Sequence, residues 1–290
     1  MPAEKIYKKV SSFFDQCIKT AVSLLKMIMR SKFSIRMPKA HNESCIILGN
    51  GPSLKTSLKN NPSAFTTHPL VCVNSFSTTE EYLLLKPQYY VILDFAFWLN
   101  DDKVILDTIE ALKTKTTWPL HLFVPRLASK SKRFKTLCDE NKNIHLTYFN
   151  YSVFNGFPSI AHFFYRKNLA MPQSQNVLVA AIFLSINIGF KKMILVGADH
   201  TWHQTLHVND NNILCFKDAH FYENEEKANY IPFKKGAHLT ETFRMHEIMT
   251  TLGKTFYGYE VLKKYADNCG VDIYNASEVS FIDAFERKKL

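Results

Sequence analysis

Short apolar runs alternate with helix-like segments from residue 44 onward, and this alternation limits the possible folds of the chain more than any other feature. The expected strands cover residues 45–49, 70–75, 89–94, 120–125, 144–149, 193–199 and 271–275. The expected helices lie between them at residues 78–85, 103–115, 129–140, 176–189 and 240–268, the last capped by Thr240. Such alternation predicts an α/β fold, a Rossmann-like parallel sheet with helices on both faces.

A glycine-rich turn follows the first expected strand, with the sequence Leu48-Gly49-Asn50-Gly51-Pro52-Ser53. Two glycines let backbone amides approach an anion, and Ser53 can cap a helix whose N-terminus carries partial positive charge. We therefore expect the phosphate of a nucleotide here. The turn lacks the downstream glycine of the dinucleotide fingerprint and the Gly-Lys-Ser/Thr of the phosphate loop, so a purely structural turn remains the alternative.

Polar residues follow four of the expected strands. They are Asn50 and Ser53, Asn74 and Ser75, Asp94, and Asp199 with His200. The carboxyl ends of parallel strands meet at one edge of a sheet, so we expect these side chains to converge on a ligand, with Asn50, Asn74 and Asp199 as partners for a nucleotide. The alternative is that each residue ends its own strand in a turn.

The first 36 residues have the pattern of a basic amphipathic helix. Its apolar positions are Ile6, Val10, Phe13, Phe14, Cys17, Ile18, Ala21, Leu24, Leu25 and Ile28. Because Lys19 and Lys26 interrupt any apolar run long enough to span a bilayer, we expect the helix to lie on an anionic membrane surface. Packing on the body or on a partner subunit is the alternative. We divide the chain into residues 1–40 and a domain of residues 41–290, with a lid at about 200–237.

The charge of the chain is concentrated in this first segment. Nine basic and two acidic residues lie within residues 1–40, which leaves +3 of the net +10 for the other 250 residues. This distribution argues against nucleic-acid binding. The basic cluster at 126–135 fits a solvated helix face, or a minor role in binding an acidic acceptor. Six widely spaced cysteines and no secretory signal predict reduced thiols and a cytoplasmic location.

Three motifs together resemble the bacterial sialyltransferases of glycosyltransferase family 42 and their wider relatives. The motifs are Ile47-Leu48-Gly49-Asn50-Gly51-Pro52-Ser53-Leu54, Val71-Cys72-Val73-Asn74-Ser75-Phe76, and the segment from Ile188 to Gly197-Ala198-Asp199. They occur in the family's order, and the match covers most of residues 44–275. The resemblance implies a GT-A-like variant of the fold with a mobile lid, a cytidine-monophosphate (CMP)-linked sugar as donor, and neither metal nor cofactor.

The resemblance also implies roles for individual residues. Asn50, Gly51, Ser53 and Asn74 would contact the nucleotide, and a lid histidine, His220 in Asp218-Ala219-His220-Phe221-Tyr222, would act as general base in an inverting displacement, with His238 as the competing candidate. The family's phosphate-binding tyrosines have no counterpart in residues 200–207, so His203, His207, Trp202, Tyr222 or Tyr230 would hold the leaving phosphate. The family's Thr-Ser-Gly corresponds here to Ser174-Gln175-Asn176. The full expected binding set is Asn50, Gly51, Pro52, Ser53, Asn74, Ser75, Asp94, Asn176, Asp199, His203, His207 and Tyr222.

Three functions remain open at this point. The first is a glycosyltransferase on the inner face of the cell membrane, which acts on a glycan or lipid-linked acceptor such as lipopolysaccharide, lipooligosaccharide or capsule. By analogy with the family, it would form a homo-oligomer. The second is an ATP- and magnesium-dependent pterin diphosphokinase, which a similar Gly-Asn-Gly-Pro-Ser turn suggests. The third is a noncatalytic nucleotide- or glycan-binding protein. Asp199, His200, His203 and His207 could form a metal site, but the zincin motif is missing, and Asp101-Asp102 lacks Asp-x-Asp spacing.

Overall fold

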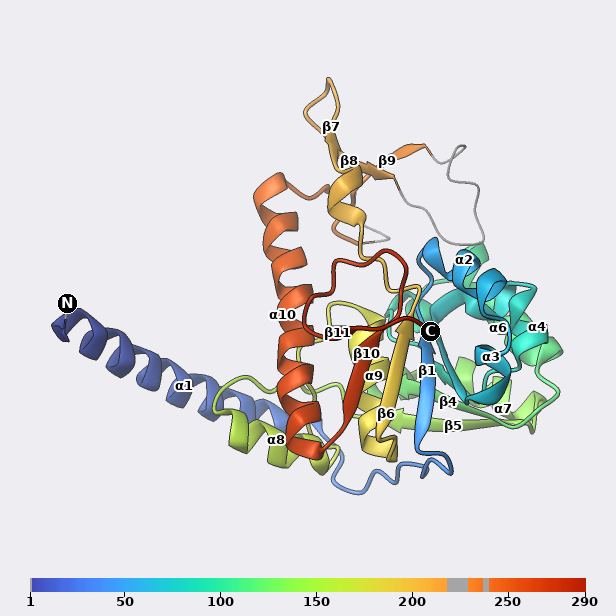
Figure 1. Ribbon diagram of the computed structural model, residues 1–290, viewed down its shortest axis with the longest axis horizontal. Coiled ribbons are helices and arrows are strands. Elements are labelled where there is room, and N and C mark those ends of the chain that lie inside the picture. Colours follow the sequence, from blue (N-terminus) through green and yellow to red (C-terminus); the bar gives the residue numbers. More distant parts are fainter. Residues whose placement is uncertain (1, 218–228, 237–239) are drawn as a thin grey trace.

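A parallel β-sheet forms the centre of the protein (Figure 1). The computed structural model describes residues 2–217, 229–236 and 240–290. Eight strands lie side by side in the order β11-β10-β6-β1-β2-β3-β4-β5. Their bounds are β1 Ser44–Leu48, β2 Leu70–Val73, β3 Tyr89–Val91, β4 Leu120–Pro125, β5 Ile144–Phe149, β6 Lys192–Val196, β10 Asp272–Asn275 and β11 Glu286–Arg287.

The strand order reverses between β1 and β6. Strands β1 to β5 step outward on one side of the sheet, and β6 then pairs with the opposite edge of β1. Ile46 of β1 consequently lies between Leu70 of β2 and Ile194 of β6. A reversal of this kind opens a crevice outside the carboxyl ends of the strands, which is where ligands bind in open α/β sheets.

Helices cover both faces of the sheet, as the sequence predicts. One face packs on α2 Ser53–Asn60, α3 Ala64–Thr67, α4 Glu81–Leu85, α5 Ala96–Leu99, α6 Lys103–Lys115 and α7 Arg133–Glu140. The other face packs on α8 Pro158–Arg166, α9 Val177–Ile188 and α10 Met245–Cys269, together with the end of α1 Pro2–Arg30. Side chains alternate between the two cores along β1, with Cys45 and Ile47 in one core and Ile46 and Leu48 in the other. Burial on both sides explains why the four buried residues of this strand, 45–48, are all apolar.

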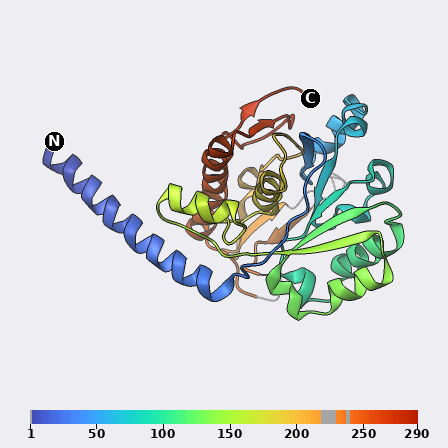
Figure 2. The ribbon, with the colours of Figure 1, turned by 90° about the horizontal axis from the view of Figure 1, so that it is seen from below.

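Helix α1 projects from the body of the protein (Figures 1 and 2). It ends at Arg30, earlier than the predicted 36, where the side chain of Asn150 bonds both backbone groups of Lys32. The Ser31 hydroxyl donates to the Leu169 carbonyl (2.6 Å), and the Lys32 N–H donates to Asn150 Oδ1 (2.9 Å). In the described part of the chain no helix has both the length and the apolarity needed to cross a bilayer.

Hydroxyl groups attach the last turns of α1 to the segment before α8. Thr20 Oγ1 accepts the Phe157 N–H at 3.0 Å. Ser23 Oγ donates to the Asn155 carbonyl at 2.8 Å and accepts the N–H of the same residue at 3.0 Å. Met27 of this helix enters the core at 3% exposure, Leu24 packs against that core, and Phe13 contacts Phe157. The helix therefore docks through a narrow face that combines hydroxyl groups with a few apolar side chains.

Part of the predicted lid forms a small antiparallel sheet. After the 3₁₀ turn η3 Trp202–Thr205, strands β7 His207–Val208, β8 Leu214–Lys217 and β9 Tyr230–Pro232 pair in the order β7-β8-β9. Leu214 packs with Ile248 and Leu252 of α10. The sequence indicated a lid here but no strands, because strands of two to four residues are too short to show a periodic pattern. Residues 218–228 and 237–239 of the predicted lid lie outside the described part.

Most predicted elements are confirmed, and the errors lie at their ends. Residues 103–115 and 144–149 form α6 and β5 with the predicted bounds, whereas residues 129–140 divide into the 3₁₀ turn η2 Arg126–Lys130 and α7. Helix α10 begins at Met245 and not near Thr240, because the Glu247 carboxylate accepts the Arg244 N–H at 2.8 Å and closes its first turn. Strand β2 ends at Val73, where Asn74 begins the 3₁₀ turn η1 Asn74–Thr78 with a left-handed backbone (φ +48°).

Candidate functional site

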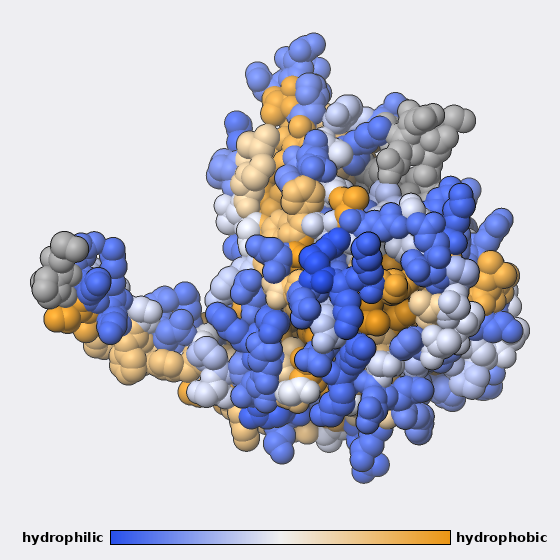
Figure 3. All heavy atoms as spheres, in the orientation of Figure 1, coloured by the Kyte–Doolittle hydropathy of each residue, from blue (hydrophilic) through white to orange (hydrophobic). Residues whose placement is uncertain are grey.

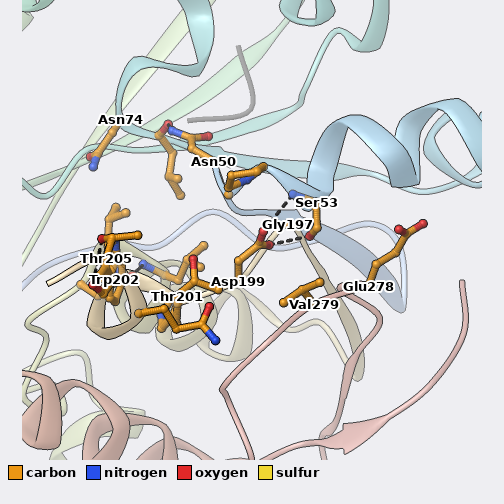
Figure 4. Close-up of a pocket in the computed structure, with 18 of the residues that line it drawn as sticks. Asn50, Ser53, Asn74, Gly197, Asp199, Thr201, Trp202, Thr205, Glu278 and Val279 are labelled. Carbon is orange, nitrogen blue, oxygen red and sulfur yellow. Dashed lines mark hydrogen bonds between the residues drawn. The ribbon is translucent and has the colours of Figure 1, made fainter. Parts of the chain in front are cut away.

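A pocket of about 650 Å³ lies at the point where the strand order reverses (Figure 4). It opens beyond the carboxyl ends of β1, β2 and β6, and the N-terminus of α9 and the loop before β11 complete its wall. The expected residues that line it are Asn50, Gly51, Pro52, Ser53, Asn74, Asn176 and Asp199. Seven members of the predicted set, from four separate segments, therefore share one pocket.

Two turns cross in direct backbone contact at the floor of this pocket. The Gly49 N–H donates to the Val196 carbonyl at 2.8 Å, and the Gly51 N–H donates to the Gly197 carbonyl at 2.9 Å. A Cβ on Gly49 would lie 2.2 Å from the Gly197 oxygen, so a side chain has no space there. The glycines of the turn thus serve the contact between β1 and β6, and Gly197 (φ +68°) supplies the left-handed residue of the second turn.

Asp199 occupies the N-terminus of α2 (Figure 4). Its carboxylate accepts the Ser53 N–H at 2.8 Å and the Ser53 hydroxyl at 2.5 Å. Ser53 is the first residue of α2 and not its cap, because the acceptor comes from β6. The prediction that amides of this turn hold a phosphate meets a physical obstacle, since the Gly51 and Ser53 amides already have protein acceptors and a carboxylate stands at the helix terminus.

Asn50 and Asn74 bring to the pocket amide oxygens that have no partner among the described residues. Asn50 Nδ2 donates to the Val73 carbonyl at 3.3 Å, but the Oδ1 atoms of both residues are buried and accept no hydrogen bond among the described residues. The Asn74 carbonyl accepts the Tyr90 hydroxyl, which helps to hold the left-handed backbone of Asn74. Buried acceptors normally have donors, so these two oxygens mark a place for N–H or O–H groups of a ligand.

His200 is buried at the wall of the pocket in a left-handed conformation (φ +56°). Its Nε2 shares a hydrogen bond of 2.6 Å with the Tyr259 hydroxyl, and its ring packs on Trp202 with centroids 4.4 Å apart. Burial lowers the pKa of His200 to about 3, so the ring is neutral at physiological pH. Two strained residues, Asn74 and His200, thus flank the same pocket, a pattern common at functional sites.

The N-terminus of α9 and Lys217 bring positive charge to the pocket. Asn176 Oδ1 accepts the Leu178 N–H at 2.7 Å and so caps α9, whose N-terminus borders the pocket. Lys217 of β8 also lines the pocket. The partial charge of the helix N-terminus and the ammonium group both favour an anion on this side. Asn176 therefore acts on the pocket through the helix that it caps.

The loop between β10 and β11 braces the second turn. The Ser280 hydroxyl donates to the Ala198 carbonyl (2.6 Å), and Ser277 Oγ accepts the Ala198 N–H (2.9 Å). This loop also brings Glu278 to the pocket. Glu278 and Lys217 are not among the predicted residues, because neither follows a strand of the reversal point. The chain gives no local signal that they lie near Asn50.

Four residues of the predicted set lie away from the pocket lining. They are Ser75, Asp94, His203 and His207. Asp94 is exposed and accepts the Ala96 N–H at 2.9 Å, so it ends its own strand in a turn. His203 packs on Phe281, and the exposed His207 packs on Tyr230. The polar residues that follow β1, β2 and β6, at the reversal point, converge on the pocket. Asp94, which follows β3, does not, because β3 lies two strands from β1.

The predicted catalytic histidine lies outside the described residues. This applies to His220, to Tyr222 and to the competing base His238. Within the described ranges, no group of three or more histidine, cysteine, aspartate or glutamate residues is arranged to hold a metal ion. Asp199 binds Ser53 while His203 and His207 pack on separate aromatic rings, so the potential ligands that the sequence suggested are dispersed.

Comparison with known proteins shows a shared fold. No family model matches the chain, and no curated protein matches it. Among solved structures, the chain is similar to the MAf glycosyltransferase from Magnetospirillum magneticum AMB-1, with a TM-score of 0.51 and 11% sequence identity. The similarity covers 95% of this chain and 38% of the other, so the chain spans well under half the length of that protein. The α/β fold with a large parallel sheet is thereby shown.

Proposed function

We propose that the protein is a glycosyltransferase that binds a CMP-linked sugar donor in the pocket between β1, β2 and β6. The observation that carries this proposal is the pair of buried amide oxygens of Asn50 and Asn74 at the reversal point of the sheet, which have no partner in the described part of the chain. Nucleotides bind at such reversal points, and their ribose hydroxyls and base amino groups supply the donors that these oxygens lack. The structural neighbour is named a glycosyltransferase, and the resemblance to family 42 also supports a glycosyltransferase.

The charges of the pocket suggest an orientation for the donor. Because Asp199 covers the N-terminus of α2, we place the phosphate at the opposite wall, near the N-terminus of α9 and Lys217. The nucleoside would then lie toward Asn50 and Asn74. This orientation differs from the phosphate-binding glycine turn that the sequence suggested, and it keeps the same residues as nucleotide contacts.

The reaction that fits this donor is a direct displacement at the anomeric carbon with inversion. It needs a base near neutral pKa to take the proton of the acceptor hydroxyl. His200 is unsuited because burial lowers its pKa to about 3 and its Nε2 is bonded to Tyr259. We keep His220 as the proposed base, without a metal or cofactor. The proposed acceptor is a cell-surface glycan, reached while α1 lies on the inner face of the membrane.

Calorimetric titration with CMP, CDP, uridine diphosphate (UDP) and ATP, each with and without magnesium, tests the proposal. We expect metal-independent binding of CMP. Asn50→Ala and Asn74→Gly should each weaken it about tenfold, the effect of losing one buried hydrogen bond. Glycine at position 74 keeps the left-handed backbone, and Asn211→Ala, in an exposed turn, is the matched control.

Other results of this titration would overturn the proposal. Magnesium-dependent binding of ATP without CMP would indicate a diphosphokinase. Full CMP affinity in Asn50→Ala and Asn74→Gly would move the nucleotide to another site. If CMP binds as expected, a donor and acceptor screen with His220→Ala as control separates an enzyme from a noncatalytic binding protein, because His220→Ala should abolish transfer and leave CMP binding intact.

A further inference from the structure

A second cavity, of about 750 Å³, lies where α1 meets the body. We call it the α1 groove. The last turns of α1 form one wall, and the segments that follow β3, β4 and β5 form the other. Its basic residues are Lys19, Lys26, Arg30, Arg126 and Lys130. These residues come from segments almost a hundred positions apart, and only the docking of α1 brings them together.

The charge of the α1 groove is largely uncompensated. Among the residues that the structure describes, no acidic residue lines it, and Lys19 alone of its cations has an ionic partner, Asp15 at 2.6 Å. Lys26, Arg30, Arg126 and Lys130 form no ion pair within the described ranges. Four cations around one cavity repel one another, and an anion in the cavity would relieve that repulsion. The Arg126 guanidinium also donates to the Arg30 carbonyl, which ties this wall to the end of α1.

Apolar side chains share the groove with these charges. Ile18, Val22 and Met29 of α1 face Phe95 and Leu127 of the body, and all five are between 43% and 64% exposed. Exposed apolar residues continue from the groove along α1 toward its start, at Val10, Phe14 and others (Figure 3). The helix docks through Thr20, Ser23, Met27 and the partly buried Leu24, and Phe13 packs on Phe157, whereas the residues of this apolar stripe stay exposed.

We propose that the α1 groove binds the phosphate head group of an anionic membrane lipid, with the hydrocarbon chain along the apolar stripe of α1. A free phosphate would use the cations and leave the stripe exposed to water. A second copy of the chain would bring a further set of like charges to the groove. An anionic amphiphile satisfies both the charge and the apolar surface.

The α1 groove lies close to the nucleotide pocket, so a bound lipid would lie near the proposed reaction. Gln173 lines the α1 groove and Asn176, three residues later, caps the helix that borders the nucleotide pocket. The Tyr151 hydroxyl, which also lines the groove, donates to the Ser174 carbonyl at 2.8 Å between them. A lipid held in the groove therefore lies beside the donor site. That it carries the acceptor glycan rests on the proposed function, whereas lipid binding itself does not.

Vesicle sedimentation of the full chain tests the inference. Phosphatidylcholine vesicles with and without phosphatidic acid should separate the charge requirement from apolar insertion. Lys26→Ala with Lys130→Ala removes two groove charges and should weaken binding to acidic vesicles about tenfold or more, given the contribution of each basic residue near an anionic surface. The control is Lys132→Ala with Lys135→Ala, which removes the same charge from exposed positions outside the groove and should change binding less than threefold.

Several outcomes would overturn the inference. Equal losses in the two double variants would show diffuse attraction, and equal binding to neutral vesicles would show apolar insertion alone. Binding of glycerol phosphate to the groove as tight as that of a short-chain phosphatidic acid would identify a free phosphate. A dimer that the groove variant converts to monomer would identify a second copy. CMP titration of the same samples keeps the two proposals apart, since the groove variant should bind CMP as the wild type does.

Discussion

Two close backbone contacts at a glycine hold different parts of the molecule. One is the crossing, where the turns after β1 and β6 meet, and the other is the dock, where α1 meets the segment before α8. At the crossing, a Cβ on Gly49 would meet the Gly197 carbonyl oxygen at 2.2 Å. At the dock, a Cβ on Gly156 would meet Thr20 Oγ1 at 2.1 Å. The first contact lies between two central strands of the sheet, whereas the second attaches one projecting helix (Figure 2).

The crossing and the dock differ in whether the parts that they join can move separately. The crossing is surrounded by both hydrophobic cores, so opening it requires global unfolding. Helix α1 buries few apolar side chains, and its polar bonds can open without disturbing the sheet. We therefore expect a rigid pocket between β1, β2 and β6 beside a more easily detached α1.

The largest effect is expected at the crossing. Gly49→Ala should lower the free energy of unfolding by about 3–5 kcal/mol, because the new methyl group overlaps the Gly197 carbonyl in a fully packed region. Chemical denaturation checks this value. Gly253→Ala in α10 is the control, because no atom lies within 4 Å of its added Cβ; it should raise stability by up to about 1 kcal/mol. A mild effect of Gly49→Ala would show that the two turns can separate.

The next effect concerns the carboxylate that joins the turns. Asp199→Asn replaces a charged acceptor of the Ser53 N–H and hydroxyl with a neutral one, and it should cost about 2 kcal/mol of folding stability. Asp94→Asn is the control, since Asp94 is exposed and accepts one backbone N–H; its cost should stay below about 1 kcal/mol. Equal costs would mean that the α2 terminus does not depend on β6.

Acid should destabilise the pocket wall through His200. Its pKa is about 3 in the folded protein and about 6.5 when unfolded. Between these pH values the unfolded chain binds a proton that the folded chain does not, so stability present at pH 7 is lost progressively as the pH falls below 6.5. The contribution of this residue at pH 5 is a loss of about 2 kcal/mol.

His200→Gln should remove that part of the pH dependence, as thermal denaturation between pH 5 and pH 7 would show. The exposed His207 provides the control, because His207→Gln should leave the slope unchanged. A wild-type slope in His200→Gln would show that His200 does not govern the acid sensitivity.

The smallest global effect is expected at the dock. Gly156→Ala introduces a clash with Thr20 at a left-handed position (φ +136°), and α1 should shift away from the body. We expect the unfolding free energy to change by about 1 kcal/mol or less, while protease cleavage near residues 20–31 accelerates. If Gly156→Ala destabilises the protein as strongly as Gly49→Ala, α1 unfolds together with the core and does not detach separately.

The sequence predicted the fold better than it predicted the site. Strand and helix periodicity is a local property, so seven core strands and the amphipathic α1 could be found from composition along the chain. The three-residue β9 and the two-residue β7 and β11 were missed because they are too short to show alternation. Of the predicted pocket, Asn50, Asn74 and Asp199 were found because each follows a strand next to the reversal point, a position that strand order decides.

The sequence alone determined that the chain forms a layered α/β domain with a basic amphipathic helix, because apolar spacing and charge are written residue by residue. The tertiary structure decided that the glycines of the first turn accommodate β6, that Asp199 binds Ser53, and that Lys26 and Lys130 share one groove. These pairings join residues about a hundred or more positions apart. Their energies depend on distances of a few ångströms, which no local pattern specifies.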